Sequence, residues 1–321
     1  MRSLARVAFC GLAVCLPGSA IADEAGVSFW LPGQFSSLAA VPPSPGVYLG
    51  ANTYLYSGSA NASRTFPIGV NVAANVKANV EIELFTGLYV PDTTVFGGRL
   101  SLALTGIYGR SHTTAHVSIG PITGQRAETV WGFGDLYPLV TLSWNRGFNN
   151  WMVYLTGDAP VGAYSATRIA NIGLGHGAID GGAAYTYLSP KGRELSVISG
   201  FTGNFENPTI HVASGVDFHA DAEASQFLNK QTYVGVVGYA YQQVTGDTGS
   251  GRKLGPFKGR VFGAGPEFGY LFPVGRRQAS LNVRAYFEFA PHNRLHGSAV
   301  YITLGLPIGG PKSPAGAMSP Q

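Results

Sequence analysis

Residues 210–244 read IHVASGVDFHADAEASQFLNKQTYVGVVGYAYQQV, and this stretch decides the fold class. In its first half apolar residues occupy the even positions, whereas Asp217, His219, Asp221 and Glu223 occupy odd ones. In a β-strand this alternation puts an apolar file on one face and a polar file on the other. A wall with lipid outside and a polar lumen inside requires that pattern. The sequence therefore predicts a transmembrane β-barrel.

The composition agrees with a barrel. The chain has 321 residues, 45 glycines and only 12% charged residues, whereas soluble domains average about 25% charged residues. Beyond the N-terminus no run of 18 apolar residues occurs, which argues against transmembrane helices. A barrel reconciles low charge with moderate hydropathy, because only alternate residues must be apolar.

The N-terminus has the features of a signal peptide. Arg2 and Arg6 precede an apolar run at 7–16, and small residues predict cleavage after Ala22. Both cysteines leave with this segment, so we expect no disulfide in the mature chain. The formal charge falls from +4 to +2, which is 19 basic minus 17 acidic residues. Without a basic block we expect no nucleic-acid partner. The predicted location is the outer membrane of a Gram-negative bacterium.

Strand-like runs separated by turn residues fill most of the mature chain. Compact links rich in Gly, Pro and Asn recur about every 40 to 55 residues, which leaves room for two spanning strands between them. Longer links lie between those turns, as in outer-membrane barrels. Twelve antiparallel strands are predicted in an up-and-down barrel over residues 47–308, and fourteen if 111–131 forms a hairpin of its own. Their ranges are 47–57, 69–90, 98–110, 132–144, 151–160, 177–188, 194–205, 210–225, 232–244, 257–272, 279–290 and 298–308.

Two segments flank the predicted barrel. Residues 23–46 are too rich in proline to form a central strand. They either fold into the lumen as a plug or form a periplasmic arm, and three large aromatic residues within them favour the plug slightly. Of these, Phe29 and Trp30 are candidate ligand contacts because they lie outside any predicted strand. Residues 309–321 are predicted to be a flexible tail.

Charged residues recur on alternate positions of other predicted strands. An unpaired Arg or Lys facing mid-bilayer lipid costs about 2–4 kcal/mol, so we expect these side chains to face the lumen. Inside a twelve-stranded barrel they either stiffen the wall through ion pairs or select what passes. The candidates for the lumen and transport path outside residues 23–46 are Lys77, Glu81, Glu83, Asp217, His219, Asp221, Glu223, Glu267, Arg284 and Glu288.

Aromatic residues gather near the ends of the predicted strands. We expect most of them to form girdles at the two membrane interfaces rather than ligand contacts. They are Tyr54, Tyr56, Tyr108, Trp131, Trp144, Trp151, Tyr187, Tyr239, Tyr241, Tyr270 and Phe272.

Several short motifs are spread over the mature chain. They are SFWLPG at 28–33, GFGDLY at 132–137, SGVDFH at 214–219, GYAYQQVTGD at 238–247, GSG at 249–251, LG at 254–255, GPE at 265–267 and EF at 288–289. With these motifs the chain resembles the outer-membrane family associated with the meta-cleavage (MetA) pathway of phenol degradation. This resemblance implies a β-barrel transporter of aromatic or other hydrophobic compounds.

The expected function is passive uptake of small hydrophobic or aromatic compounds through an outer-membrane channel. One alternative is a structural or surface-interaction barrel with a blocked lumen, and another is an outer-membrane hydrolase. Neither a nucleophile elbow nor Cys/His metal spacing occurs in the mature sequence, so we expect no catalytic residue, metal or cofactor. The expected partners are outer-membrane lipid, the solutes and the barrel-assembly machinery.

Overall fold

The computed structural model describes residues 28–60, 65–68, 70–119, 122–250, 258–275 and 277–310. The predicted signal peptide, its cleavage after Ala22 and most of the predicted tail lie outside these residues. In the described part no helix is long and apolar enough to cross a membrane.

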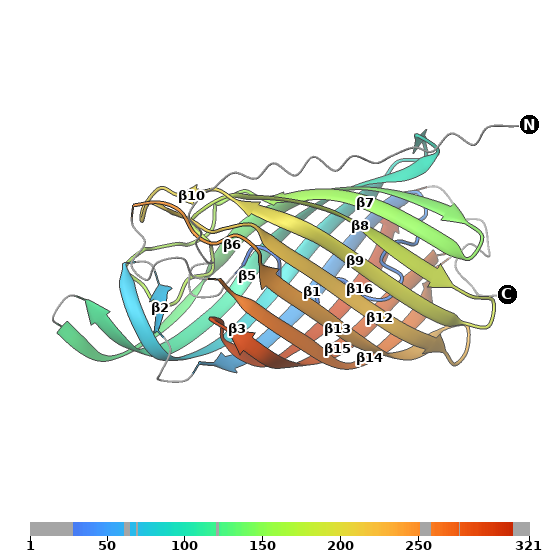
Figure 1. Ribbon diagram of the computed structural model, residues 1–321. Helices are drawn as coiled ribbons and strands as arrows, with labels where there is room; N and C mark the ends of the chain where they lie inside the picture. The colour runs from blue at the N-terminus through green and yellow to red at the C-terminus, as the bar shows by residue number, and fades with distance from the viewer. Residues whose placement is uncertain are drawn as a thin grey trace, which may run out of the picture.

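Twelve antiparallel strands form a closed barrel (Figure 1). β1 pairs with β16 on one side and with β3 on the other, which closes the sheet. The all-β barrel with twelve strands is confirmed. Its strands are β1 (Gly46–Ser59), β3 (Asn71–Val90), β5 (Gly98–Ile119), β6 (Ile122–Arg146), β7 (Asn149–Asp158), β8 (Ala178–Leu188), β9 (Arg193–Asn204), β12 (Asp217–Phe227), β13 (Thr232–Gln243), β14 (Arg260–Val274), β15 (Arg277–His292) and β16 (His296–Gly309).

The fourteen-stranded alternative is wrong, because residues 111–131 lengthen two strands instead of adding two. β5 and β6 pair continuously until Ile119 faces Ile122. β7 pairs with β6 only from Leu139 onward. The part of the β5–β6 hairpin nearest Ile119 and Ile122 therefore extends beyond β7. Two short strands, β2 (Thr65–Ile68) and β4 (Thr94–Val95), pair with β3 and β5.

The strand predicted at 210–225 begins later than expected, at Asp217. The residues before it form a small hairpin of β10 (Glu206–Asn207) and β11 (Val212–Ala213). At its tip His211 is exposed and has φ 52°, and its N–H donates to the carbonyl of Asn207. The alternating pattern before Asp217 therefore belongs to a loop.

Short turns and long loops lie at opposite ends of the barrel, as predicted. The chain reverses at 147–148 and 189–192 through Gly147 and Gly192, which have φ 65° and 71°. Glycine adopts such angles without steric cost. The end with the short turns also holds the start of β1 and the end of β16 (Figure 1), which corresponds to the periplasmic end of outer-membrane barrels.

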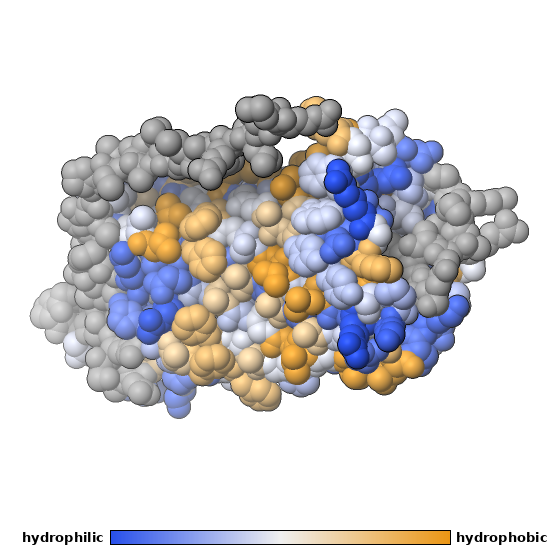
Figure 2. All heavy atoms as spheres, turned by 45° about the vertical axis from the view of Figure 1, so that its right-hand side comes forward, coloured by the Kyte–Doolittle hydropathy of each residue, from blue (hydrophilic) through white to orange (hydrophobic). Residues whose placement is uncertain are grey.

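Large apolar side chains cover the outside of the barrel. Figure 2 shows them across the middle of the visible wall, with polar side chains toward both ends. Such a band is the surface that contacts lipid in outer-membrane barrels. Its most exposed members include Leu49, Phe85, Leu104, Phe133, Leu155, Phe201, Val236 and Phe287.

A charge introduced into this band will destabilise the barrel. Val236 on β13 is 63% exposed, and Val236→Arg should lower the free energy of unfolding in lipid vesicles by about 2–4 kcal/mol. Equilibrium urea unfolding in phospholipid vesicles measures this change. The matched control is Gln125→Arg, on the part of β6 beyond the band, which should stay within about 1 kcal/mol of the parent. Equal effects of the two substitutions would contradict the proposed lipid-facing band.

Candidate functional site

The lumen contains the polar file of β12. Asp217, His219, Asp221 and Glu223 are each at most 2% exposed, whereas the alternate residues of β12 are more exposed and face outward. This is the orientation that their alternation predicts. A role in transport stays a prediction for all four.

The N-terminal segment, residues 28–45, lies inside the barrel beside this file. Its backbone N–H groups donate to carboxylates of the wall: Gly33 to Asp221 Oδ1 at 2.9 Å, and Leu38 to Glu194 Oε1 at 3.0 Å. A segment outside the sheet has no ladder to satisfy its N–H groups, so these carboxylates replace a neighbouring strand. Of the two predicted arrangements, the plug is the one observed.

Ser37 joins two more strands at the same level. Its hydroxyl contacts Glu267 Oε2 on β14 at 2.7 Å and Glu194 Oε2 on β9 at 3.1 Å. Glu267 also accepts a hydrogen bond of 2.7 Å from the side chain of Asn282 on β15. The segment is therefore held by polar side chains in the periplasmic half of the lumen.

The next two strands of the wall, β15 and β16, donate to carbonyls of the segment. Tyr301 Oη donates to Pro32 O at 2.9 Å, and Arg284 donates to Gln34 O at 3.3 Å. Arg284 also lies over the Tyr301 ring, with 5.0 Å between the guanidinium carbon and the ring centroid. The segment is thus hydrogen-bonded across the lumen, with acceptors on β9, β12 and β14 and donors on β15 and β16.

Phe29 and Trp30 pack against the wall. Trp30 is fully buried and stacks on His219 with 3.6 Å between ring centroids, and His219 Nε2 lies 2.7 Å from Asp180 Oδ2. Phe29 meets Tyr137 edge-on at 5.0 Å. Neither residue lines the cavity described below, so the arrangement does not support the predicted ligand contacts.

The inward orientation predicted for Lys77, Glu81 and Glu83 is wrong. On β3 the inward file is apolar, with Ile82 buried at 8% exposure, and these three charged residues face outward. Glu81 pairs with Arg110 on the outer surface at 2.8 Å. For Lys77 and Glu81 the physical reason is length: β3 has 20 residues, about twice the number needed to span, so the part of β3 that holds them lies beyond the hydrocarbon.

Four tyrosines of the predicted girdles, Tyr54, Tyr56, Tyr239 and Tyr241, line the interior instead. For two of them the sequence held a signal. In the β12–β13 hairpin His219 faces Tyr241 and Asp221 faces Tyr239, and residues directly opposite each other point to the same side of a sheet. Once His219 is placed inside, Tyr241 must be inside as well.

Above the segment lies an apolar cavity of about 180 Å³. Leu31 and Pro32 line it from the segment, and residues 169–174 line it from the connection between β7 and β8. The cavity occupies the extracellular half of the lumen, since the parts of β1, β3 and β5 that line it lie toward the long loops. Its wall includes Tyr54, Val80, Ile82, Ile107, Tyr137 and Tyr239.

The connection between β7 and β8, residues 159–177, is fastened to β6 at two levels. Asp135, 1% exposed, accepts the N–H groups of Gly162 and Leu174, each at 2.7 Å. The register of β6 against β5 shifts between Phe133 and Leu136, so Asp135 lies within this irregularity of the strand. Without this carboxylate two part-buried N–H groups of the loop would lose their acceptor.

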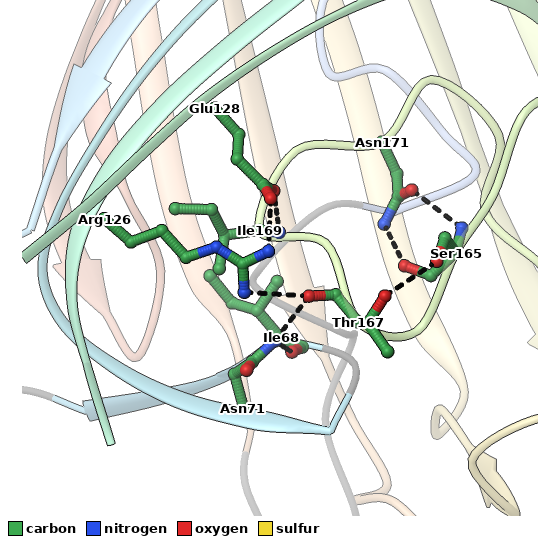
Figure 3. A network of polar contacts seen from close by, with 8 residues as sticks. All are labelled: Ile68, Asn71, Arg126, Glu128, Ser165, Thr167, Ile169 and Asn171. Atoms are coloured by element: carbon green, nitrogen blue, oxygen red, sulfur yellow. Dashed lines mark hydrogen bonds and ion pairs between the residues drawn. The ribbon is translucent and has the colours of Figure 1, made fainter. Parts of the chain in front are cut away.

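The second attachment is drawn in Figure 3. Glu128 accepts the N–H of Ile169 at 2.6 Å, and Arg126 donates to the carbonyl of Thr167 at 2.9 Å while pairing with Glu128. The carbonyl of Thr167 also faces the amide of Asn71 on β3. The long β5–β6 hairpin thus positions the loop over the cavity.

Glu288 is the predicted site residue that reaches the cavity. It accepts hydrogen bonds from Tyr56 Oη at 3.0 Å, Tyr239 Oη at 2.7 Å and Gly297 N at 2.7 Å. His176 also lines the cavity. Burial lowers the pKa of His176, with Asp135 opposing the shift, which keeps the imidazole neutral near pH 7.

Among the described residues no group of three or more His, Cys, Asp or Glu side chains has the geometry of a metal site.

Comparison with known proteins identifies related folds. A family model described as "Putative MetA-pathway of phenol degradation" matches residues 46–304. An outer membrane channel from Pseudomonas putida F1 has a TM-score of 0.67 and 12% identity, covering 87% of this chain and 100% of that chain. At this identity the likeness shows the fold alone, that of an outer-membrane barrel.

Two further structures are more distant. A Pseudomonas aeruginosa FadL homologue has a TM-score of 0.43 and 9% identity, covering 90% of this chain and 100% of that chain. The CymD monoaromatic hydrocarbon channel has a TM-score of 0.36 and 8% identity, with 83% and 89% covered. No curated protein matches the sequence significantly.

Weakening one carboxylate will loosen the N-terminal segment. Asp221→Asn replaces one of two acceptor oxygens by an NH₂ group, which faces a backbone N–H at Gly33 or Phe35. Loss of a charge-assisted hydrogen bond costs about 1.5–3 kcal/mol, so release of the segment should increase about 10- to 100-fold. The maleimide labelling rate of an introduced Ser36→Cys measures release. Glu83→Gln on the outer wall is the control, and an unchanged rate in Asp221→Asn would contradict the assigned role.

A single methyl group will test the fit of the segment. Gly33 has φ +81°, and a Cβ there would lie 2.6 Å from the Tyr286 ring. Gly33→Ala should therefore destabilise the filled barrel by about 1–3 kcal/mol, seen as earlier thermal unfolding in detergent. Gly87→Ala is the matched control, because a Cβ at Gly87 meets nothing within 4 Å. Indistinguishable unfolding of the two variants would show that the segment does not pack as described.

Proposed function

The chain belongs to the family described as a putative MetA-pathway of phenol degradation, and from that premise we propose that it is a passive channel for small hydrophobic or aromatic compounds. The channel works in the outer membrane of a Gram-negative bacterium, where the barrel-assembly machinery inserts it. Diffusion through a channel needs neither a catalytic residue nor a cofactor.

The cavity beneath the loop at 159–177 is the observation that carries the proposal. An outer-membrane channel for ions or sugars has a polar, water-filled lumen, whereas aliphatic side chains and tyrosine rings dominate the wall of this cavity. Apolar cavities of roughly 150 Å³ take up benzene. A cavity of about 180 Å³ therefore suits a molecule built on one aromatic ring.

A solute that leaves the cavity toward the periplasm meets the N-terminal segment. Hydrogen bonds to Asp221, Glu194, Glu267 and Arg284 hold the segment in the periplasmic half of the lumen. Apart from the peptide bond to β1, no covalent bond within the described residues holds it there, so displacement of the segment can open the path. In this proposal the N-terminal segment closes the periplasmic half of the lumen at rest, and the cavity is the binding site that a solute occupies before the segment is displaced.

Flux through proteoliposomes tests the proposal. Full-length mature protein and a variant lacking residues 28–43 are reconstituted, and the entry of radiolabelled toluene and of radiolabelled sucrose is followed. The intact protein should admit toluene faster than protein-free liposomes and exclude sucrose. The shortened variant should admit toluene faster still, because the segment no longer occupies the periplasmic half of its lumen.

Two outcomes would contradict the proposal. Failure of both proteins to admit any solute above protein-free liposomes would favour a structural barrel with a blocked lumen. Turnover of an ester or lipid substrate by the intact protein, lost when His219 or Asp217 is changed, would favour a hydrolase.

A further inference from the structure

The Glu288 carboxylate in the cavity wall has one hydrogen-bonding position that no described residue fills. A carboxylate offers about four lone-pair positions, and Glu288 fills three of them. Among the described residues its Oε2 accepts from Tyr56 and from the backbone N–H of Gly297, whereas its Oε1 accepts from Tyr239 alone. Glu288 is among the residues that line the cavity, so its Oε1 can accept one more hydrogen bond, from a molecule inside.

The other charged group of the described cavity wall is already engaged. The guanidinium carbon of Arg294 lies 4.1 Å from the centroid of the Tyr241 ring, and its Nη2 donates to Ser28 Oγ at 3.4 Å. Both contacts hold Arg294 between the wall and the N-terminal segment. Glu288 is thus the charged acceptor of the described cavity wall.

His176 adds a second acceptor. Its Nδ1 lies 3.1 Å from the carbonyl of Gly177, and because a carbonyl only accepts, Nδ1 carries the proton. In a neutral imidazole the other nitrogen, Nε2, is then an acceptor. The hydroxyls of Ser111 and Thr113 in the same wall can donate or accept, so they do not discriminate between ligands that donate and ligands that accept. Glu288 Oε1 and His176 Nε2 thus place two acceptors in the cavity wall.

We propose that the cavity prefers small aromatic molecules that carry one hydrogen-bond donor, a hydroxyl or an amino group, and that Glu288 is the specificity-determining residue that accepts from it. This inference rests on the proposed function and names the class of solute within it. An aromatic ring that carries a donor packs against the apolar wall, and its donor fills the fourth hydrogen-bonding position of the Glu288 carboxylate. A ring that can only accept brings a second oxygen toward the carboxylate and leaves its position unfilled.

A hydrogen bond to a charged group corresponds to a preference of about 10- to 100-fold. Four probes of similar size separate the cases: benzyl alcohol and benzylamine donate, acetophenone only accepts, and toluene does neither. Binding to full-length mature protein in detergent is followed by ligand-detected NMR, with protein-free micelles as the reference for partitioning. We expect benzyl alcohol and benzylamine to bind at least about 10-fold more tightly than acetophenone or toluene.

Glu288→Gln should invert the preference. The backbone N–H of Gly297 cannot turn away and needs an oxygen at the Oε2 position, so the NH₂ group must occupy the Oε1 position. The Tyr239 hydroxyl can rotate and accept from it. The cavity then presents a donor where it had an acceptor, and acetophenone should gain affinity while benzyl alcohol loses it. Glu83→Gln, on the outer wall, is the matched control and should leave all four affinities unchanged.

A second variant keeps the test decisive if Glu288→Gln does not fold. Tyr239→Phe removes one donor from Oε1 and leaves the carboxylate in place, so the preference for donors should persist or increase. Equal binding of all four probes to the parent protein, or an unchanged preference in Glu288→Gln, would overturn the inference and leave a non-selective channel standing. Absence of binding by every probe would overturn the proposed function as well.

Discussion

The arrangement of the lumen depends on hydrogen bonds between buried carboxylates and backbone N–H groups of the N-terminal segment. A closed barrel leaves no edge for another strand, yet a chain folded into its lumen still needs acceptors for its N–H groups. Asp221 and Glu194 supply acceptors from the wall. Their charges in turn need donors once water is excluded. The wall and the segment therefore satisfy each other, which explains why the polar file of β12 and a proline-rich, strand-free segment occur in one chain.

These contacts divide the lumen into two halves of different chemistry. The periplasmic half holds the segment and the carboxylates that accept from it, while the extracellular half holds the apolar cavity beneath the loop at 159–177. Trp30 lies where the halves meet, stacked on His219 from the polar file. The loop above is fixed by Asp135 and Glu128, in the same way as the segment below. Carboxylates that accept hydrogen bonds from backbone N–H groups thus fix both the N-terminal segment on the periplasmic side of the cavity and the loop on its extracellular side.

Alternation and turn chemistry were enough to predict the barrel and its twelve strands, because both patterns follow from local geometry. The prediction of side-chain orientation is wrong where a strand extends beyond the membrane. On β3 the rule that charge must face inward fails for Glu81, since that part of the strand has left the hydrocarbon, and the side chain pairs with Arg110 outside. Tyr239 was assigned to a girdle by its position near a strand end, although cross-strand register with Asp221 places it inside. Loop contacts such as Asp135 with Leu174 join residues 39 positions apart, and no local pattern encodes them.

Amide hydrogen exchange of residues 33–40 in lipid nanodiscs tests the central claim most directly. If the carboxylates of the wall hold the segment, its N–H groups at Gly33 and Leu38 will exchange far more slowly than an unstructured peptide, approaching the protection of the barrel strands. Exchange at the rate of an unstructured peptide, in a barrel whose strands remain protected, would contradict the account, because the carboxylates of the lumen would then have other partners.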